Sequence, residues 1–213
     1  MPKPGQRGLF ITFEGPDGSG KTTQVNRLAD WLRSQGREVL CTREPGGTPL
    51  AERIRSLLLE CGDEEVAPET ELLLFGAARA QHVRRVILPF LERGGVVLCD
   101  RFIDSTTAYQ GYARKLDLDY VEQTHVFCTG GRMPDLTFLF DISVEDARKR
   151  QQARDNHPDR MEAEADRFHH FVREAFLKIA AREPKRFRVL DARLPIDELA
   201  ATLQKEIADA IAP

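Results

Sequence analysis

A short segment near the N-terminus combines residue types that suit the binding of a polyphosphate. It reads Gly15-Pro16-Asp17-Gly18-Ser19-Gly20-Lys21-Thr22 and has the spacing G-x-x-x-x-G-K-[ST]. Glycines let successive backbone N–H groups converge on phosphate oxygens, and a helix that begins near Lys21 points its positive end at the anion. Lys21 is expected to reach the β- and γ-phosphates and the Thr22 hydroxyl to bind Mg²⁺. A chance match is the weaker interpretation, because an apolar strand precedes the loop and an amphipathic helix follows it.

A second segment supplies a carboxylate that could serve the same metal. Val96-Val97-Leu98-Cys99-Asp100 is an apolar run that ends in an acidic residue. Such a strand delivers its carboxylate near the metal of a bound nucleotide, as in a Walker-B element. Many buried strands end in aspartate, so this segment gains weight only beside the phosphate-binding loop. Together the two segments predict an ATP and Mg²⁺ site with Thr22 and Asp100 near the metal.

Positive charges are concentrated further along the chain. The cations are Arg148, Lys149, Arg150, Arg154 and Arg160. The default interpretation of such a run is a solvated helix surface. Phosphoryl transfer, however, needs cations on the equatorial oxygens of the moving group, and the Asp17-Gly18-Ser19 part of the loop supplies none. We therefore expect a small lid over about residues 148–162 that closes over an anion.

The hydrophobic pattern predicts which elements position these groups. Short apolar runs at 9–13, 39–41, 96–99, 136–140 and 188–190 indicate strands covered on both faces, as in a parallel sheet. Helical periodicity follows the phosphate-binding loop as far as Gly36 and recurs at 50–59, 69–92, 144–154, 162–181 and 196–211, with a bend or interruption at Pro89. This alternation predicts an α/β fold with a central five-stranded parallel sheet flanked by helices.

Composition indicates one globular domain over residues 1–213. The 213 residues include 41% hydrophobic residues and carry a formal net charge of −3, which favours neither nucleic acid nor membrane as a partner. No apolar run approaches the ~20 residues that span a bilayer. Residues 1–7 lack an apolar stretch of signal-peptide type, so a cytoplasmic location is expected. The four cysteines form no CxxC pair, which favours reduced, mostly buried thiols over zinc or redox chemistry.

Four blocks of sequence carry a resemblance to a known family. They are residues 13–23, which contain the phosphate-binding loop, then Thr42-Arg43-Glu44-Pro45-Gly46-Gly47-Thr48, Asp100-Arg101-Phe102 and Ala108-Tyr109-Gln110-Gly111. The chain resembles the thymidylate kinases over nearly its whole length, and the second and fourth blocks are specific to this family among P-loop kinases. The resemblance implies a P-loop nucleoside-monophosphate kinase fold, phosphorylation of dTMP to dTDP with ATP and Mg²⁺, and a homodimer.

The resemblance also implies an acceptor-phosphate site around Arg101. A guanidinium suits a phosphate because it stays charged and binds two oxygens in a fork. A surface salt bridge is the commoner fate of an arginine, but the position directly after a strand-end aspartate favours the phosphate role. Glu44 and Pro45 lie in a loop that borders this site by resemblance, although the segment could be simply a tight turn. Arg53 is expected to help bind the acceptor phosphate.

By resemblance, two further groups of residues form the base and sugar pocket. Phe75 and Arg79 lie four positions apart on one helix, where Phe75 would stack on the thymine ring and Arg79 would bind its carbonyl edge. Without the resemblance, Phe75 would be assigned to the core, where most aromatic side chains lie. Thr106, Tyr109 and Gln110 match the segment that completes the pocket, and Tyr109 would crowd a 2′-hydroxyl and so favour deoxyribose.

The implied mechanism is positioning and charge neutralisation. The second pKa of a phosphate monoester is about 6, so the acceptor is largely dianionic at pH 7 and needs no strong general base. Lys21, Arg101 and the lid arginines would neutralise charge, while Asp17 would hold Mg²⁺ or the substrate, unless it is an ordinary turn residue. The five histidines fall outside the motif blocks and are expected to be structural or on the surface.

Thymidylate kinases exist in two forms, with an arginine either in the P-loop or in the lid. This chain has none in its P-loop and several in the lid, so it resembles the bacterial form with lid arginines. We favour Arg154 as the arginine that approaches the transferred phosphoryl group, with Arg150 and Arg160 behind it. Residues 158–162 depart from the family pattern, because a proline replaces the glycine that commonly precedes Asp-Arg. Ala192 is expected to border the bound ATP.

Three other functions remain open at the level of the sequence. The nearest is a kinase for dCMP or a deoxynucleoside, against which Arg79 and Thr106 argue for thymine. A regulatory P-loop module would turn over slowly without an acceptor, but the chain lacks the N/T-K-x-D motif of GTPases. An inactive nucleotide-binding protein is disfavoured by the intact Lys21, Thr22 and Asp100.

Overall fold

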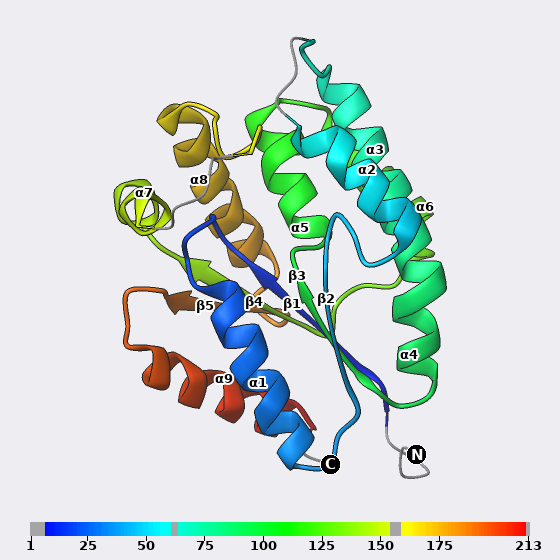
Figure 1. Cartoon of the computed structure of the whole chain (residues 1–213), viewed down its shortest axis with the longest axis vertical. Helices are drawn as coiled ribbons and strands as arrows, with labels where there is room; N and C mark the ends of the chain where they lie inside the picture. The colour runs from blue at the N-terminus through cyan, green and yellow to red at the C-terminus, as the bar shows by residue number, and fades with distance from the viewer. Residues whose placement is uncertain (1–6, 61–63, 154–158, 212–213) are drawn as a thin grey trace.

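Five parallel strands form the centre of the molecule, as the apolar runs predict. They are β1 (Leu9–Glu14), β2 (Val39–Arg43), β3 (Val96–Asp100), β4 (Leu136–Asp141) and β5 (Phe187–Asp191), paired in the order β2-β3-β1-β4-β5. Figure 1 shows the computed structural model, which describes residues 7–60, 64–153 and 159–211. In the register of β1 and β3, Phe13 lies opposite Asp100. The phosphate-binding loop and the predicted acidic strand end therefore meet at the carboxyl edge of the sheet, where ligands bind in this class of fold.

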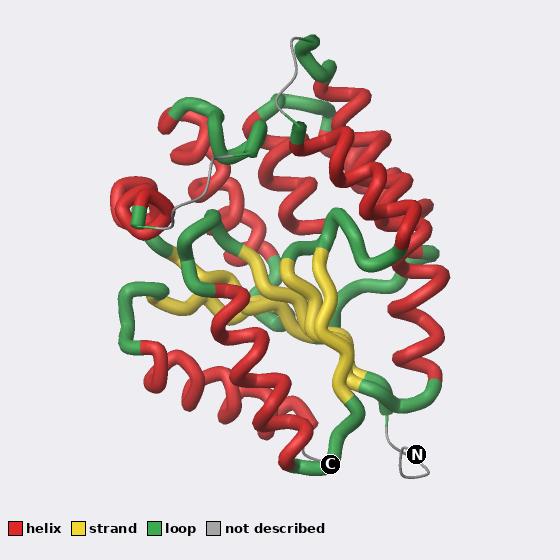
Figure 2. The backbone as a smooth tube through the Cα atoms, viewed as in Figure 1, coloured by secondary structure: helices red, strands yellow, loops and turns green. Residues whose placement is uncertain are grey.

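Helices cover both faces of this sheet (Figures 1 and 2). One face is covered by α1 (Lys21–Ser34) and α9 (Ile196–Ile211). Side chains alternate along β1, so that Ile11 and Phe13 belong to the core beneath these two helices, while Phe10 packs with Val83 and Ile87 on the opposite face. Both faces of β1 are therefore shielded from solvent, which explains why four of its six residues are apolar.

The remaining helices lie on the opposite face and above the carboxyl edge of the sheet. They are α2 (Pro49–Leu59), α3 (Pro68–His82), η1 (Val83–Ile87), α4 (Leu88–Glu92), α5 (Ile103–Thr106), η2 (Thr107–Ala113), α6 (Leu118–Thr129), α7 (Val144–Gln152) and α8 (Asp166–Arg182), of which η1 and η2 are π-helical. None of the helices within the described ranges is both long and apolar enough to cross a membrane.

The predicted interruption near Pro89 is present as a π-helical turn. The helical stretch predicted over 69–92 divides into α3, η1 and α4, and the Leu88 N–H donates to the Val83 carbonyl in a five-residue step. Proline has no amide hydrogen with which to continue the α-helical pattern, so the hydrogen bonding changes just before Pro89. The helix continues without a sharp break, and α3, η1 and α4 form one long element along the side of the sheet (Figure 1).

Two predicted helices differ from the structure in their bounds, and three helices were not predicted. The helix predicted over 162–181 begins at Asp166 in α8, because residues 160–163 form a turn. Of the helix predicted over 144–154, α7 accounts for the part that ends at Gln152, and residue 154 lies outside the described residues. The helices α5, η2 and α6 were not predicted, although η2 carries most of the segment expected to complete the acceptor pocket.

Candidate active site

The phosphate-binding loop joins β1 to α1 with the geometry that the motif predicts. Gly15 has φ +130° and Gly18 has φ +83°, backbone conformations that side chains disfavour. A Cβ at Gly15 would also lie 2.5 Å from the Phe140 carbonyl oxygen, so no side chain fits there. Lys21 is buried, and its Nζ donates to the carbonyls of Gly15 and Pro16, both at 2.9 Å. The lysine charge is therefore fixed inside the loop, at the N-terminus of α1.

Two of the predicted metal ligands lie together at the mouth of the loop. The Thr22 hydroxyl donates to Asp100 Oδ2 at 3.0 Å, which joins the start of α1 to the end of β3. A hydroxyl and a carboxylate are oxygen ligands of the kind that Mg²⁺ prefers, so this pair fits the predicted ion. Asp17, the third predicted ligand, is paired with Arg101 on the acceptor side of the loop.

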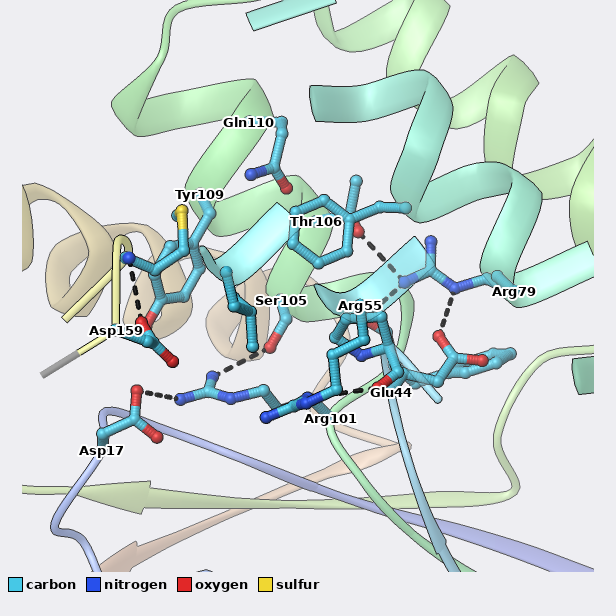
Figure 3. A pocket seen from close by; sticks show the side chains of 15 residues that line it. Asp17, Glu44, Arg55, Arg79, Arg101, Ser105, Thr106, Tyr109, Gln110 and Asp159 are labelled. Carbon is cyan, nitrogen blue, oxygen red and sulfur yellow. Dashed lines mark hydrogen bonds and ion pairs between the residues drawn. The ribbon is translucent and has the colours of Figure 1, made fainter. Parts of the chain in front are cut away.

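Beside the loop lies a cavity that contains nearly the whole predicted acceptor site (Figure 3). Each of its walls comes from a different part of the chain, namely the phosphate-binding loop, the 44–45 loop, α2, α3, the segment after β3, and residues 159–161. The predicted residues that line it are Asp17, Glu44, Pro45, Phe75, Arg79, Arg101, Thr106, Tyr109 and Gln110. The structure thus brings together side chains that are up to 144 positions apart, since Asp17 and Met161 share one cavity.

Arg101 connects this cavity to the phosphate-binding loop. Its Nη2 donates to Asp17 Oδ2 at 2.9 Å and its Nη1 to Ser105 Oγ at 3.1 Å, while its guanidinium lies 5.5 Å from the centre of the Tyr109 ring. The partial burial of Asp17 opposes its ionisation, but attraction to Arg101 and Lys21 outweighs this effect and lowers the pKa of Asp17 to about 2. Arg101 has φ +67°, so its backbone is held in the left-handed region.

A buried carboxylate beneath Arg101 was not identified as functional from the sequence. Glu14, at the end of β1, accepts from the Phe102 N–H at 2.8 Å and from Ser105 Oγ at 2.6 Å. Burial, followed by repulsion from Asp104, raises the pKa of Glu14 to about 8. Because Ser105 also accepts from Arg101, Glu14 helps to hold the segment that positions the guanidinium. The position of Glu14 directly before Gly15 was the signal in the sequence.

The far end of the cavity is formed by a rigidly held arginine. Arg79 is 2% exposed, and its Nε donates to Glu44 Oε2 at 2.7 Å. Its Nη2 donates to the Phe102 carbonyl at 3.1 Å and to Thr106 Oγ1 at 3.0 Å. Glu44 also contacts Nδ1 of the buried His82 at 3.0 Å, so the histidine is structural, as predicted. Arg79 Nη1 has no hydrogen-bond partner among the described residues.

The structure places the predicted Arg53 away from the acceptor cavity. Arg53 is exposed on α2 and does not line the cavity, whereas Arg55, two positions later, does. The Arg55 Nη1 donates to the Pro45 carbonyl at 3.1 Å, and burial together with the nearby charge of Arg43 lowers the pKa of Arg55. Successive residues of a helix are about 100° apart, so residues two apart face nearly opposite directions. Arg55 shares the buried face with Ala51 and Leu58, and this spacing was the available signal.

The predicted lid arginines have different surroundings. Arg160, predicted to bind ATP, instead donates to Glu71 Oε2 at 2.7 Å and to the Leu58 carbonyl at 2.7 Å, so its charge is used to hold the 159–163 turn. Arg154, predicted to be catalytic, lies outside the described residues. Arg150 and Ala192 line a second cavity together with Gly18, Ser19 and Gly20. This second cavity lies against the phosphate-binding loop and is not shared with the acceptor-side residues.

Two cavities thus contact one phosphate-binding loop, which is the arrangement of a P-loop nucleoside-monophosphate kinase fold. The comparisons with known proteins agree. A protein-family model described as "Thymidylate kinase" matches residues 13–203. The chain belongs to the thymidylate kinase family.

Relatives and a solved structure support this assignment. The chain is 53% identical over 206 residues to "Thymidylate kinase" of Pseudomonas fluorescens (strain SBW25), covering 97% of this chain and 95% of the relative. It is 48% identical over 201 residues to "Thymidylate kinase" of Geobacter sulfurreducens, covering 92% and 94%. A crystal structure of thymidylate kinase from Ehrlichia chaffeensis superposes with a TM-score of 0.72 at 38% identity, covering 86% of this chain and 93% of that one.

Proposed function

We propose that the protein transfers the γ-phosphoryl group of ATP to dTMP, giving dTDP and ADP, in the supply of dTTP for DNA replication. The observation that carries this proposal is the position of Arg101, which reaches from the acceptor cavity to Asp17 of the phosphate-binding loop. A phosphate bound by Arg101 would lie beside the loop that holds the donor phosphates. The reaction is then a direct in-line displacement between two bound nucleotides.

On the donor side, the proposed roles follow from the loop and the second cavity. The backbone N–H groups of residues 15–22 and the Lys21 ammonium hold the β- and γ-phosphates, while Ala192 borders the bound ATP. Thr22 and Asp100 would hold Mg²⁺, with Asp17 facing its water shell or the acceptor. When bound, this ion would neutralise the negative charge that develops on the phosphate groups.

On the acceptor side, Arg101 and Arg55 bind the phosphate of dTMP. Both guanidiniums line the acceptor cavity, and a bidentate contact from each would neutralise the dianion. At the other end of the cavity, Phe75 stacks on the base and Arg79 donates to a base carbonyl through Nη1. Tyr109 lies beside Arg101, with the guanidinium 5.5 Å from its ring centre, where it would contact the sugar.

The proposal includes a lid over about residues 148–162 in a single domain of residues 1–213. Arg150 supports it, because it lines the cavity on the donor side of the loop. Arg154 remains the arginine predicted to approach the transferred phosphoryl group. Closure of such a segment would exclude water and limit hydrolysis of ATP without transfer. A cytoplasmic location is proposed with the activity, since the nucleotide substrates are found there.

We also propose that the protein is a homodimer through α3 and α6. These helices pack together at Gly76, where an added Cβ would lie 3.1 Å from Cys128 Sγ. Large apolar side chains remain exposed on the two helices, with Leu73 at 66%, Tyr120 at 69% and Phe127 at 85%. Exposed apolar side chains on neighbouring helices favour association with another protein surface. In a two-fold dimer the same surface of a second copy of this chain would cover them.

The activity is tested by incubating the purified protein with ATP, Mg²⁺ and each nucleoside monophosphate in turn, while ADP release is measured. We expect a strong preference for dTMP, and a loss of that activity of at least about 100-fold in Arg101→Ala, because the acceptor phosphate loses its charged partner. Preference for another monophosphate would keep the kinase assignment and reject dTMP. Acceptor-independent hydrolysis that Arg101→Ala leaves unchanged would reject phosphoryl transfer altogether.

A further inference from the structure

A further buried carboxylate, Glu71, lies behind the wall of the acceptor cavity. Glu71 of α3 is fully buried and lies outside the cavity itself. It accepts from Gln110 Nε2 at 2.6 Å, from Arg160 Nη2 at 2.7 Å and from Arg114 Nε at 3.4 Å. A buried acidic side chain is costly unless it is paired and hydrogen-bonded. Here two guanidiniums stabilise the anion, and the third partner is an amide that belongs to the cavity.

The charge of Glu71 fixes the orientation of that amide. A glutamine side chain has one end that donates and one that accepts, and the two ends can exchange places by rotation. An ionised carboxylate accepts only, so Gln110 must turn its NH₂ group toward Glu71. Gln110 is 1% exposed and lines the acceptor cavity, at the end away from Asp17 (Figure 3). Its oxygen is therefore the group left for a ligand in the cavity.

The same end of the cavity carries one fixed donor. Arg79 Nη1 is buried without a partner among the described residues, while Glu44, Thr106 and the Phe102 carbonyl engage the rest of the guanidinium. An arginine can only donate. The cavity therefore offers a donor from Arg79 and an acceptor from Gln110, each held by a different buried glutamate.

This polarity matches one class of pyrimidine. Thymine and uracil present a carbonyl oxygen next to a ring N–H, whereas cytosine presents an amino group next to a bare ring nitrogen. With Arg79 donating and Gln110 accepting, a cytosine edge would set donor against donor and acceptor against acceptor. Unpaired polar groups in a buried site discriminate much more strongly than a missing methyl group does.

We propose that Glu71 is a positioning residue that determines base specificity: by holding the Gln110 amide in one orientation, it makes the cavity select bases with an N–H beside a carbonyl. The proposal rests on the proposed function, because it assumes that the cavity binds the base of the acceptor. The same carboxylate holds Arg160 of the 159–163 turn, so a test must separate the effect on the amide from a general loosening of the site.

The test compares kcat and KM for dTMP, dUMP and dCMP in the full-length protein and in Glu71→Gln. A glutamine at 71 can donate or accept, so it no longer forces one orientation on Gln110. We expect the dTMP:dCMP ratio of kcat/KM to fall about 10-fold or more, mainly through the KM values. The dTMP:dUMP ratio should be unchanged, because thymine and uracil share the same edge and differ by a methyl group.

Glu164→Gln provides the matched control. Glu164 accepts a hydrogen bond from Arg114, which also contacts Glu71. The variant therefore makes the same chemical change at a carboxylate that reaches Gln110 only through Arg114 and Glu71. It should leave both ratios as in the unmodified protein. If Glu71→Gln does not fold, Glu71→Asp keeps the negative charge near both guanidiniums but draws the carboxylate back from Gln110, and the same fall in the dTMP:dCMP ratio is expected.

Two outcomes would overturn the inference. One is a Glu71 variant that loses the same factor of kcat/KM with dTMP, dUMP and dCMP, which would make Glu71 structural only. The other is a further fall in the dTMP:dCMP ratio when Glu71→Gln is added to Gln110→Met, since Glu71 would then act through another group. An unmodified protein that does not prefer dTMP would instead reject the proposed function, which makes the two failures distinguishable.

Discussion

At the scale of single residues, the chemistry was easiest to predict where it lies in one continuous stretch. The P-loop was recognisable because its glycines, Lys21 and Thr22 act within eight positions, and Lys21 lies in the loop as expected. Arg53 and Arg55 show the limit. Both are arginines in α2, and only the direction of the helix relative to the acceptor cavity separates an exposed side chain from one that lines the site.

This difference gives a matched test of the acceptor site. Arg55→Ala should raise the KM for dTMP about 10-fold or more, because a charged hydrogen-bonding partner of the substrate phosphate is lost. Arg53→Ala makes the same change on the exposed side of the same helix and should alter the KM less than about two-fold. Steady-state kinetics with varied dTMP at saturating ATP would measure both values. Equal effects of the two substitutions would contradict the assignment of Arg55.

Arg160 has a carboxylate partner that the sequence pattern did not indicate. A cluster of positive charges predicts a phosphate-binding site only if its cations are free of ion pairs with carboxylates elsewhere in the fold. Glu71 lies 89 positions away in sequence and pairs with Arg160 at 2.7 Å. Such long-range pairing is set by the packing of α3 against the 159–163 turn, which the local sequence does not encode.

At the scale of elements, apolar runs predicted the strands because both faces of the sheet are covered. The segment that forms α5, η2 and α6 was not predicted as helical. Its apolar periodicity is weak, because the same stretch must both line the acceptor cavity and pack against the rest of the protein. Its first half supplies Thr106, Tyr109 and Gln110 to the acceptor cavity and packs against α8 on the other side. Several positions of this segment therefore carry side chains that line the cavity, so they do not follow the regular apolar spacing of an amphipathic helix.

The N-cap of α2 is expected to affect the position of Arg55 in the acceptor cavity. Thr48 is the N-cap of α2 and accepts from the Ala51 N–H at 3.1 Å, and α2 carries Arg55. Thr48→Ala should cost about 1 kcal/mol of unfolding free energy and also raise the KM for dTMP. Asp117 caps α6 in the same way, by accepting from the Asp119 N–H at 2.9 Å.

Asp117→Ala is therefore the control for that experiment. It should cost a similar unfolding free energy, measured by urea denaturation, without changing the KM for dTMP. If both cap variants lose stability but neither changes the KM, the position of Arg55 does not depend on the start of α2. Since the two caps belong to different helices, the comparison separates lost stability from lost positioning.

At the scale of the whole molecule, the order of the strands explains why distant segments share one site. β1 and β3 are neighbours in the sheet although 81 residues separate Glu14 from Val96 in the chain. Sequence patterns predicted the fold class and the resemblance predicted the location of the site, but neither defined the cavity walls. Those walls depend on how α2, α3 and η2 come together above the carboxyl edge of the sheet.

The proposed dimer is the prediction that belongs to this scale. Light scattering after size exclusion should give about twice the chain mass of 24.1 kDa. Phe127→Glu should give the monomer mass, because a charge would replace the most exposed large apolar side chain on α3 and α6. Phe171→Glu, at a side chain of α8 that is 42% exposed, should leave the mass unchanged. A monomeric unmodified protein would refute this interface.

The backbone at Arg101 has a consequence for engineering. The left-handed conformation at φ +67° costs a side-chain-bearing residue about 1 kcal/mol relative to glycine. Glycine at this position would relieve the backbone cost, but it would also remove the guanidinium that donates to Asp17 and Ser105. Libraries built to make this protein more robust need a turnover screen at every round, because a change that relaxes the backbone here removes the side chain proposed to bind the acceptor phosphate.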